Sequence, residues 1–279
     1  MALKVKINGK AYEAEKDEYI LDVCRRNSIF VPTLCHHEAL SGLGTCRLCV
    51  VEVNEGSGNK VVVSCVYPLS CDCEVFTESE KIKGIRRSIL SMLRTRAPEG
   101  DRLVSLCQMY GVGEDGRFTV SRAGKGGSRT ESPAEKHLAA ACVLCGLCAQ
   151  ACANLGTGAI STVGRGVVKK ISTPYDEPSA DCIGCASCAA VCPTRAIECT
   201  ETGNERSIWG RKFAFLACAS CGGTFATREE YAFALKKAAQ EKAGSPPPAS
   251  ESAESAPLCD ACRRKKSADV FAAAFGIRA

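Results

Sequence analysis

The feature that most constrains this chain is a pair of cysteine runs near its middle. Each run has the spacing C-x2-C-x2-C-x3-C, and the second is followed directly by a proline. This spacing is typical of chains that bind two [4Fe–4S] clusters, in which the fourth cysteine of each run binds the cluster of the other run. The predicted ligands are therefore Cys142, Cys145, Cys148 and Cys192 for the first cluster, and Cys152, Cys182, Cys185 and Cys188 for the second. Two separate zinc sites are the alternative.

The composition agrees with metal binding. Cysteine accounts for 21 of the 279 residues, and most of it is clustered in C-x2-C units rather than spread as in a small secreted disulfide scaffold. The start has no apolar run of signal-peptide length, and no stretch has the pattern of a membrane span. We therefore expect a cytoplasmic protein, where thiolates stay reduced. The net charge of +5 has one dense basic cluster, at residues 263–266, which we interpret as a solvated helix face rather than a nucleic-acid site.

The N-terminal region has the pattern of a small sheet. Apolar and polar residues alternate over residues 3–9, and Asn8-Gly9 predicts a tight turn into a second strand at 10–14. The periodicity further predicts a short helix over 19–27 and strands over 50–53 and 60–65. The arrangement fits a β-grasp sheet.

A third set of cysteines lies within this region, with the spacing Cys35-x10-Cys46-x2-Cys49-x15-Cys65. Three cysteines in one glycine-rich loop and a fourth from a distant strand predict a [2Fe–2S] cluster. Glycines in the loop allow backbone amides to approach the cluster sulfurs closely. A structural zinc site is the alternative, but the long gaps do not match the two paired C-x2-C knuckles of a zinc ribbon.

The motifs VPTLC at 31–35, GTCRLCVVEV at 44–53 and VSC at 63–65 carry a family resemblance. They resemble the N-terminal ferredoxin domain of several iron–sulfur proteins. These are the large peripheral subunit of complex I, the small diaphorase subunit of NAD-reducing hydrogenases, Fe-only hydrogenases, and Fe–S subunits of NAD-dependent formate dehydrogenases and of electron-bifurcating complexes. The resemblance covers about residues 1–200. It implies an α+β protein with a β-grasp [2Fe–2S] domain over 1–78 and a two-[4Fe–4S] ferredoxin domain over 137–200.

The connector over residues 79–136 departs from this family. Relatives continue with a helix and then a loop that supplies one histidine and three cysteines to a further [4Fe–4S] cluster. Here a helix is expected over 85–94, but residues 95–102 contain no histidine and no C-x2-C unit, and Cys107 resembles the last cysteine of the missing site. We therefore predict that this cluster is absent. In the alternative, Cys71 and Cys73 join Cys107 in an improvised site, although Cys-x-Cys is a poor chelating unit for a cubane.

The C-terminal region, 201–279, contains a last pair of C-x2-C units. Cys218 with Cys221 and Cys259 with Cys262 form the pattern of a tetrahedral four-sulfur site, for zinc or for a single iron, and a further Fe–S cluster from the same thiolates is a third possibility. Helices are expected over 228–243 and 267–275, with a disordered loop over 244–257. The cysteines left without a site, expected to be buried free thiols, are Cys24, Cys71, Cys73, Cys107 and Cys199.

No glycine-rich dinucleotide fingerprint, flavin-binding pattern or hydrogen-activating cysteine set occurs in the sequence. We therefore expect no catalytic site on this chain and predict an electron-transfer subunit of an NAD(P)-linked oxidoreductase. The resemblance implies a flavin-bearing NADH subunit with a thioredoxin-like [2Fe–2S] companion on one side, and a nickel–iron hydrogenase or a formate dehydrogenase on the other. Low-potential clusters also fit a bifurcating complex that uses ferredoxin. The alternatives are a stand-alone polyferredoxin-type shuttle and a zinc-dependent regulatory or assembly protein.

Overall fold

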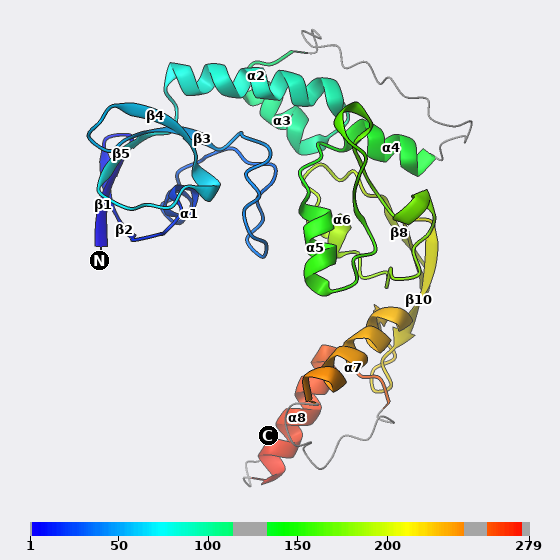
Figure 1. Ribbon diagram of the computed structural model, residues 1–279. Helices are drawn as coiled ribbons and strands as arrows, with labels where there is room; N and C mark the ends of the chain where they lie inside the picture. The colour runs from blue at the N-terminus through cyan, green and yellow to red at the C-terminus, as the bar shows by residue number, and fades with distance from the viewer. Residues whose placement is uncertain (1, 114–132, 243–255, 275–279) are drawn as a thin grey trace. The chain divides into compact units, whose positions relative to one another are not determined.

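The computed structural model describes residues 2–113, 133–242 and 256–274 (Figure 1). The chain forms two compact units. The first contains Met1–Tyr175 and Ser187–Glu198, and the second contains Asp176–Ala186 and Cys199–Ala279. Almost all of the predicted loop over 244–257 lies outside the described residues. Within the described part of the chain, no helix is both long and apolar enough to cross a membrane.

The first unit begins with a five-stranded sheet of order β2-β1-β5-β3-β4. Its strands are β1 (Ala2–Ile7), β2 (Lys10–Glu15), β3 (Val50–Asn54), β4 (Asn59–Val63) and β5 (Cys73–Phe76). The predicted hairpin is confirmed, because β1 pairs antiparallel with β2 through Asn8 and Gly9, both with positive φ. The predicted helix is also confirmed as α1 (Ile20–Arg26).

The sheet buries one face against α1, and alternate strand residues supply that core. The buried side chains include Val5, Ile7, Ile20, Leu21, Val51, Val53 and Val75. One prediction needs correction: the strand expected over 60–65 ends at Val63, and Cys65 lies in a short 3-10 turn, Ser64–Val66. The turn places Cys65 at the end of the sheet rather than within it: the Ser64 N–H still bonds to the Cys49 carbonyl in the β3–β4 register, and the chain then turns at Cys65.

Two helices form the connector, α2 (Glu80–Arg96) and α3 (Asp101–Met109). The first is longer than the predicted 85–94, because the hydroxyl of Ser79 caps it by accepting the Ile82 N–H at 3.3 Å. These helices share a second core with the cysteine loops at 34–48 and 143–147. Its apolar members include Leu34, Leu48, Leu90, Leu103, Leu106, Val143 and Leu147. Residues 114–132 of the predicted connector lie outside the described residues.

The two-cluster region of the first unit is built from short elements. They are α4 (Pro133–Ala141), α5 (Leu147–Leu155), β6 (Ser161–Val163), β7 (Lys170–Ser172) and α6 (Ser187–Ala190), with 3-10 turns at Gly166–Val168 and Pro174–Asp176. The strands β6 and β7 pair antiparallel. Each of the helices α5 and α6 carries a cysteine from the end of a C-x2-C-x2-C run, so local helix formation fixes the direction of those thiols.

The second unit contains a four-stranded sheet that the sequence did not predict. Its order is β11-β10-β9-β8, from β8 (Cys199–Thr202), β9 (Glu205–Ile208), β10 (Arg211–Ala217) and β11 (Thr224–Thr227). The pairs are all antiparallel. The helix α7 (Arg228–Lys242) agrees with the prediction, whereas α8 (Asp260–Ala274) begins earlier than predicted, so Cys262 lies in its first turn.

Candidate functional site

The four N-terminal cysteines come together in two neighbouring pairs, Cys35 with Cys46 and Cys49 with Cys65, and all four are buried. The Cys46 N–H donates to the sulfur of Cys35 at 3.2 Å. The hydroxyl and the N–H of Ser64 both donate to the carbonyl of Cys49, at 2.7 and 3.2 Å. These bonds hold the turn that carries Cys65 against the loop that carries the other three cysteines.

The paired thiols perturb each other's ionisation. The hydrogen bond from the Cys46 thiol lowers the pKa of Cys35 to about 5, against the opposing effect of burial. In the same way, the Cys65 thiol lowers the pKa of Cys49 to about 7. Ligands to iron must be deprotonated, and buried thiolates need a compensating positive charge. The donor set therefore fits an iron–sulfur cluster bound by these four cysteines.

Glycines let the cysteine loop pack tightly. A Cβ on Gly42 would lie 2.7 Å from the carbonyl oxygen of Cys65, so a larger residue would push the loop away from the turn. Gly44 has φ +61°, a conformation that side chains rarely adopt. Gly42 therefore lets the loop lie against the Cys65 carbonyl, and the expected approach of loop amides to cluster sulfurs stays a prediction.

Arg86 on α2 is a further part of this site that the sequence did not reveal. Its side chain is fully buried, and its guanidinium donates to the carbonyls of Leu48 at 3.0 Å and Val50 at 2.9 Å, the two residues on either side of Cys49. It also donates to the Tyr110 hydroxyl at 2.8 Å and pairs with Glu78. The connector helices therefore brace the N-terminal cysteine loop, a role that the sequence signals only by an arginine within an amphipathic helix.

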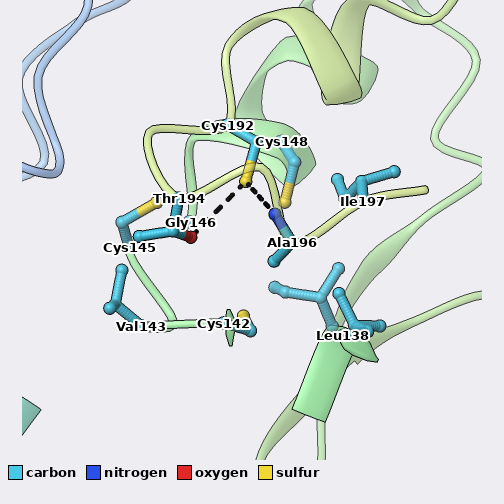
Figure 2. Close-up of a pocket in the computed structure, with 11 residues that line it drawn as sticks. Leu138, Cys142, Val143, Cys145, Gly146, Cys148, Cys192, Thr194, Ala196 and Ile197 are labelled. Atoms are coloured by element: carbon cyan, nitrogen blue, oxygen red, sulfur yellow. Dashed lines mark hydrogen bonds between the residues drawn. The ribbon is translucent and has the colours of Figure 1, made fainter. Parts of the chain in front are cut away.

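The first predicted [4Fe–4S] ligands, Cys142, Cys145, Cys148 and Cys192, line one pocket (Figure 2). Apolar side chains complete its walls, among them Leu138, Val143, Ile171 and Ile197. All of these residues belong to the first unit. The structure therefore brings together the crossed set, in which the fourth sulfur comes from the second cysteine run.

Backbone N–H groups point at sulfur atoms of this pocket. Leu144 donates to Cys142 at 3.4 Å, and Ala196 donates to Cys192 at 3.3 Å, as the dashed line in Figure 2 marks for the second bond. Leu144 has φ +55° and Gly146 has φ +86°, so the loop turns sharply on both sides of Cys145. Such left-handed residues cost conformational energy and are common at binding sites, where the turn presents donors to a ligand.

Burial raises the pKa of three thiols in this pocket. The pKa of Cys142 and of Cys148 is raised, and that of Cys145 is raised to about 12, in each case chiefly by desolvation. Apolar walls disfavour isolated thiolates, so a cluster that binds here would displace the protons of these three thiols. Four converging sulfurs in an apolar pocket fit a [4Fe–4S] cluster.

The second predicted set divides between the two units. Cys152 and Cys188 belong to the first unit, and Cys182 and Cys185 belong to the second, so their assignment to one cluster remains a prediction. The loop around Cys185 nevertheless repeats the turn around Cys145. Gly184 has φ +70° and Ala186 has φ +59°, at the same two positions of the C-x2-C-x2-C unit.

The first two cysteine loops touch each other within the first unit. The hydroxyl of Thr45, next to Cys46, donates to the carbonyl of Cys145 at 3.0 Å. A Cβ on Gly146 would lie 3.2 Å from the side chain of Leu43. The loops that carry the N-terminal cysteines and the first pocket are therefore in direct hydrogen-bonded contact.

The unassigned cysteines occupy different environments. Cys73 lies in the core of the first sheet and Cys107 in the core around the connector helices, where its thiol lies 3.9 Å from the Leu90 carbonyl. These two thiols therefore do not form the improvised site considered above. Cys24 is buried, but Cys199 is half-buried and Cys71 is exposed, so the expectation that all five are buried is wrong for Cys199 and Cys71. Cys71 lies in a surface bend just before β5, outside the core that covers Cys73.

The C-terminal cysteines form a compact group. The sulfur atoms of Cys218, Cys221, Cys259 and Cys262 all lie within 4.8 Å of one another, and those of Cys221 and Cys259 are 3.8 Å apart. Cys218 follows β10, and a tight turn at Gly222 leads into β11, whereas the other pair opens α8. The Cys259 N–H donates to the sulfur of Cys218 at 3.3 Å, and backbone bonds from Cys259 and Cys221 lower the pKa of Cys218 to about 6. The group fits a tetrahedral metal ion.

Two family models match the chain. A 2Fe-2S iron-sulfur cluster binding domain matches residues 1–80, and a 4Fe-4S dicluster domain matches residues 141–196. The predicted resemblance to iron–sulfur proteins is confirmed. The α+β fold class is confirmed as well, with a ferredoxin domain, a dicluster domain and a C-terminal cysteine knuckle in that order. The knuckle lies beyond both matched segments.

Named relatives are of the predicted kinds. The NADH-ubiquinone oxidoreductase 75 kDa subunit of Reclinomonas americana is 31% identical over 205 residues, covering 70% of this chain and 29% of the relative. The NADP-reducing hydrogenase subunit HndD of Solidesulfovibrio fructosivorans is 32% identical over 214 residues, covering 70% of this chain and 36% of HndD. The gamma subunit of the NAD-reducing hydrogenase HoxS of Cupriavidus necator is 29% identical over 126 residues, covering 44% of this chain and 52% of the gamma subunit. This chain thus spans between 29% and 52% of the length of these relatives.

A solved structure shows the same fold. A chain in the crystal structure of NAD+-reducing [NiFe]-hydrogenase in the H2-reduced state superposes with a TM-score of 0.55, covering 69% of the iron–sulfur chain and 85% of the hydrogenase chain. The sequences are 22% identical in this comparison, so the likeness concerns the fold.

Proposed function

We propose that this chain is an electron-transfer subunit that relays electrons between a flavin-bearing NAD(P)H subunit and the catalytic module of a hydrogenase or a formate dehydrogenase. The observation that carries the proposal is the direct contact between two cysteine loops, from Thr45 to the carbonyl of Cys145. Iron–sulfur clusters, when bound, supply reversible one-electron chemistry. A relay needs its centres close together, and this contact brings two sets of predicted ligands into one unit.

The donor sets support electron transfer rather than substrate chemistry. The [2Fe–2S] ligands are Cys35, Cys46, Cys49 and Cys65, and each [4Fe–4S] cluster takes the crossed set of four cysteines given above. Four cysteines for each cluster leave no coordination position open to a substrate. The protein then sets the reduction potentials of the clusters through the burial of the clusters and through hydrogen bonds to their sulfur atoms.

The partners follow from the relatives. The relatives are named as subunits of an NADH-ubiquinone oxidoreductase, an NADP-reducing hydrogenase and an NAD-reducing hydrogenase. We infer that this chain receives or delivers electrons at a flavin and NADH-binding subunit with a thioredoxin-like [2Fe–2S] companion, in the cytoplasm. The hydrogenase or formate dehydrogenase subunits lie at the other end. A bifurcating complex that also uses ferredoxin is the extended form of this proposal.

For the C-terminal group we propose a zinc ion. Zn–S bonds of about 2.3 Å in a tetrahedron place the sulfur atoms about 3.8 Å apart. That spacing agrees with the Cys221–Cys259 separation of 3.8 Å. A cubane holds its ligand sulfurs further apart, because an iron–iron edge separates them, so the compact group favours a single ion. A mononuclear iron has the same geometry, and metal analysis distinguishes the two.

Electron paramagnetic resonance combined with metal analysis of the purified native complex tests the proposal. We expect one [2Fe–2S] and two [4Fe–4S] signals with about ten irons per chain, and one zinc. Fewer irons contradict the ligand assignment. Size-exclusion chromatography of native extract separates the two electron-transfer functions: elution as a free chain of 29.5 kDa contradicts the subunit proposal and favours a stand-alone polyferredoxin-type shuttle.

A further inference from the structure

The loop that carries Cys182 and Cys185 rests directly on the sheet of the second unit. A Cβ on Gly184 would lie 2.5 Å from the ring of Phe213, which is fully buried on β10. Gly184 also has φ +70°. Both facts require glycine at this position, because any side chain would collide with the ring or strain the turn. The loop therefore packs directly on β10 of this sheet.

Arg211, the first residue of β10, binds the loop from its N-terminal side. One guanidinium nitrogen donates to the carbonyls of Ser179 at 2.6 Å, Ala180 at 3.0 Å and Cys182 at 2.8 Å. The guanidinium also stacks on the ring of Phe213, with its central carbon 4.7 Å from the ring centroid. Stacking fixes the orientation of the guanidinium, so the side chain that binds the three carbonyls has little conformational freedom.

Two further residues bind the next two carbonyls. Arg206 on β9 donates to the carbonyl of Gly184 at 2.6 Å, and its own position is fixed by Glu201 at 2.8 Å. The buried hydroxyl of Thr227 donates to the carbonyl of Ile183 at 2.6 Å. Each carbonyl from Cys182 to Gly184 thus receives a side-chain donor from the sheet.

This pattern has a physical reason. A cysteine loop around a cluster turns backbone N–H groups toward the sulfurs, so its carbonyls face away and need other donors. Two of the donors here, Arg206 and Arg211, carry a full positive charge. Reduction adds negative charge to a cluster, and a nearby positive charge stabilises the reduced state. Arginines at the back of the loop therefore act on both its geometry and its electrostatics.

We propose that Arg206 and Arg211 are positioning residues for the second [4Fe–4S] cluster, which fix the loop of Cys182 and Cys185 and raise the reduction potential of the cluster. The inference rests on the proposed function, because it takes these two cysteines as cluster ligands. In this proposal the sheet at 199–227, which lies beyond the matched dicluster segment, influences electron transfer through the second [4Fe–4S] cluster.

The test compares Arg211→Met with Lys212→Met in the complete chain. Lys212 is the next residue of β10, its side chain is 74% exposed, and it pairs with Glu205 rather than with the loop. Each variant removes one positive charge from the same strand. The measurements are redox titration followed by electron paramagnetic resonance, and iron content.

We expect Arg211→Met to lower the midpoint potential of one [4Fe–4S] signal. The expected change is at least tenfold in the ratio of oxidised to reduced cluster at fixed potential, about 59 mV for a one-electron couple. The [2Fe–2S] signal and the other [4Fe–4S] signal keep their midpoints, and Lys212→Met shifts none of the three. Loss of about four irons in Arg211→Met alone also supports the proposal.

The inference and the proposed function fail in different ways. A wild-type chain with fewer than two [4Fe–4S] signals overturns the proposed function. Two results overturn this inference alone, given two [4Fe–4S] signals in the wild type. One is full iron content with unchanged midpoint potentials in Arg211→Met, and the other is an equal shift of the midpoint potential in Lys212→Met. If Arg211→Met does not fold, Arg206→Gln carries the same test, since it removes the charge and the bond to Gly184, and an unchanged midpoint in that variant overturns the inference.

Discussion

Single buried side chains decide how firmly the cysteine loops are held. Arg86 has no exposed surface, and its charge is compensated by Glu78, by the Tyr110 hydroxyl and by the carbonyls of Leu48 and Val50. Burying a charge is favourable only with such a complete set of partners. The connector thus contributes stability to the neighbouring cysteine loop.

Replacing Arg86 by methionine tests this contribution. We expect the free energy of unfolding to fall by about 3–5 kcal/mol, because the two carbonyls and Glu78 lose their donor. Chemical denaturation under anaerobic conditions measures the change. The control is Lys83→Met on the same helix, whose ion pair with Glu80 lies at the surface and is expected to contribute less than about 1 kcal/mol. Equal effects of the two variants would contradict the role of Arg86.

A second residue-scale prediction concerns pH. Burial raises the pKa of the Cys24 thiol from 9.0 to about 11, partly offset by the charge of Arg86. The unfolded chain therefore loses this proton before the folded chain does, so stability is intact below pH 9 and falls as the pH rises toward 11. The contribution reaches about 2.7 kcal/mol for a shift of about two pKa units.

Denaturation midpoints measured from pH 8 to 10.5 test this prediction in the variant Cys24→Ala. We expect a shallower loss of stability with pH than in the wild-type chain, whatever the cost of the substitution at neutral pH. Cys71→Ala is the matched control because Cys71 is exposed, and its pH profile should follow the wild type. A profile for Cys24→Ala that runs parallel to the wild type would refute the assignment.

Among the elements, the cysteine loops are linked by side chains rather than by strand pairing. The loop at 35–49 meets the loop at 142–148 through the bond from Thr45 to the Cys145 carbonyl and through Leu43 against Gly146. The core shared with α2 and α3 lies behind both loops. The distance between the two predicted clusters is therefore set by a few local contacts.

Thr45→Val removes the hydroxyl and keeps the side-chain volume. We expect full cluster content and a severalfold slower electron exchange between the [2Fe–2S] and first [4Fe–4S] clusters, because the hydrogen-bonded link is lost. Time-resolved reduction followed by optical spectroscopy measures the exchange. Thr45→Ser keeps the hydroxyl and should restore the rate; equal slowing in both variants would argue against the bond.

At the scale of the whole molecule, the chain combines two units that are stabilised in different ways. The first unit has two apolar cores. The second combines a four-stranded sheet with the cysteine group of Cys218, Cys221, Cys259 and Cys262, and β10 joins Arg211 directly to Cys218. A metal ion in this group would therefore stabilise the same sheet that holds the loop of Cys182 and Cys185.

Cys221→Ser tests that dependence, since Cys221 is exposed and contributes little to packing. We expect loss of one zinc per chain, faster hydrogen exchange in β10 and β11, and an unchanged [2Fe–2S] signal from the first unit. Hydrogen exchange with mass spectrometry and metal analysis measure these effects. The control is Cys71→Ser, an exposed cysteine outside the metal group, which should change none of them. Retained zinc with unchanged exchange would contradict a metal-stabilised sheet.

The spacing of cysteines and glycines determined the candidate centres, because ligand spacing in a C-x2-C unit is a local property of the backbone. The same holds for the hairpin at Asn8-Gly9, whose turn conformation depends on two residues. The sheet at 199–227 had a usable local signal as well: Phe213 and Phe215 have the two-residue spacing of one strand face, and Gly203, Trp209 and Gly210 form turns with positive φ.

Other features depend only on the tertiary structure. Arg86 reaches carbonyls 36 and 38 residues away, Arg211 reaches carbonyls 29 to 32 residues away, and Thr45 reaches one 100 residues away. An arginine on an amphipathic helix or at the start of a strand has no local mark that distinguishes a buried donor from a solvated charge. The sequence by itself therefore determined which thiols are available to bind metal, whereas the packing of distant segments decided which donors surround them, because those contacts exist only once the chain has folded.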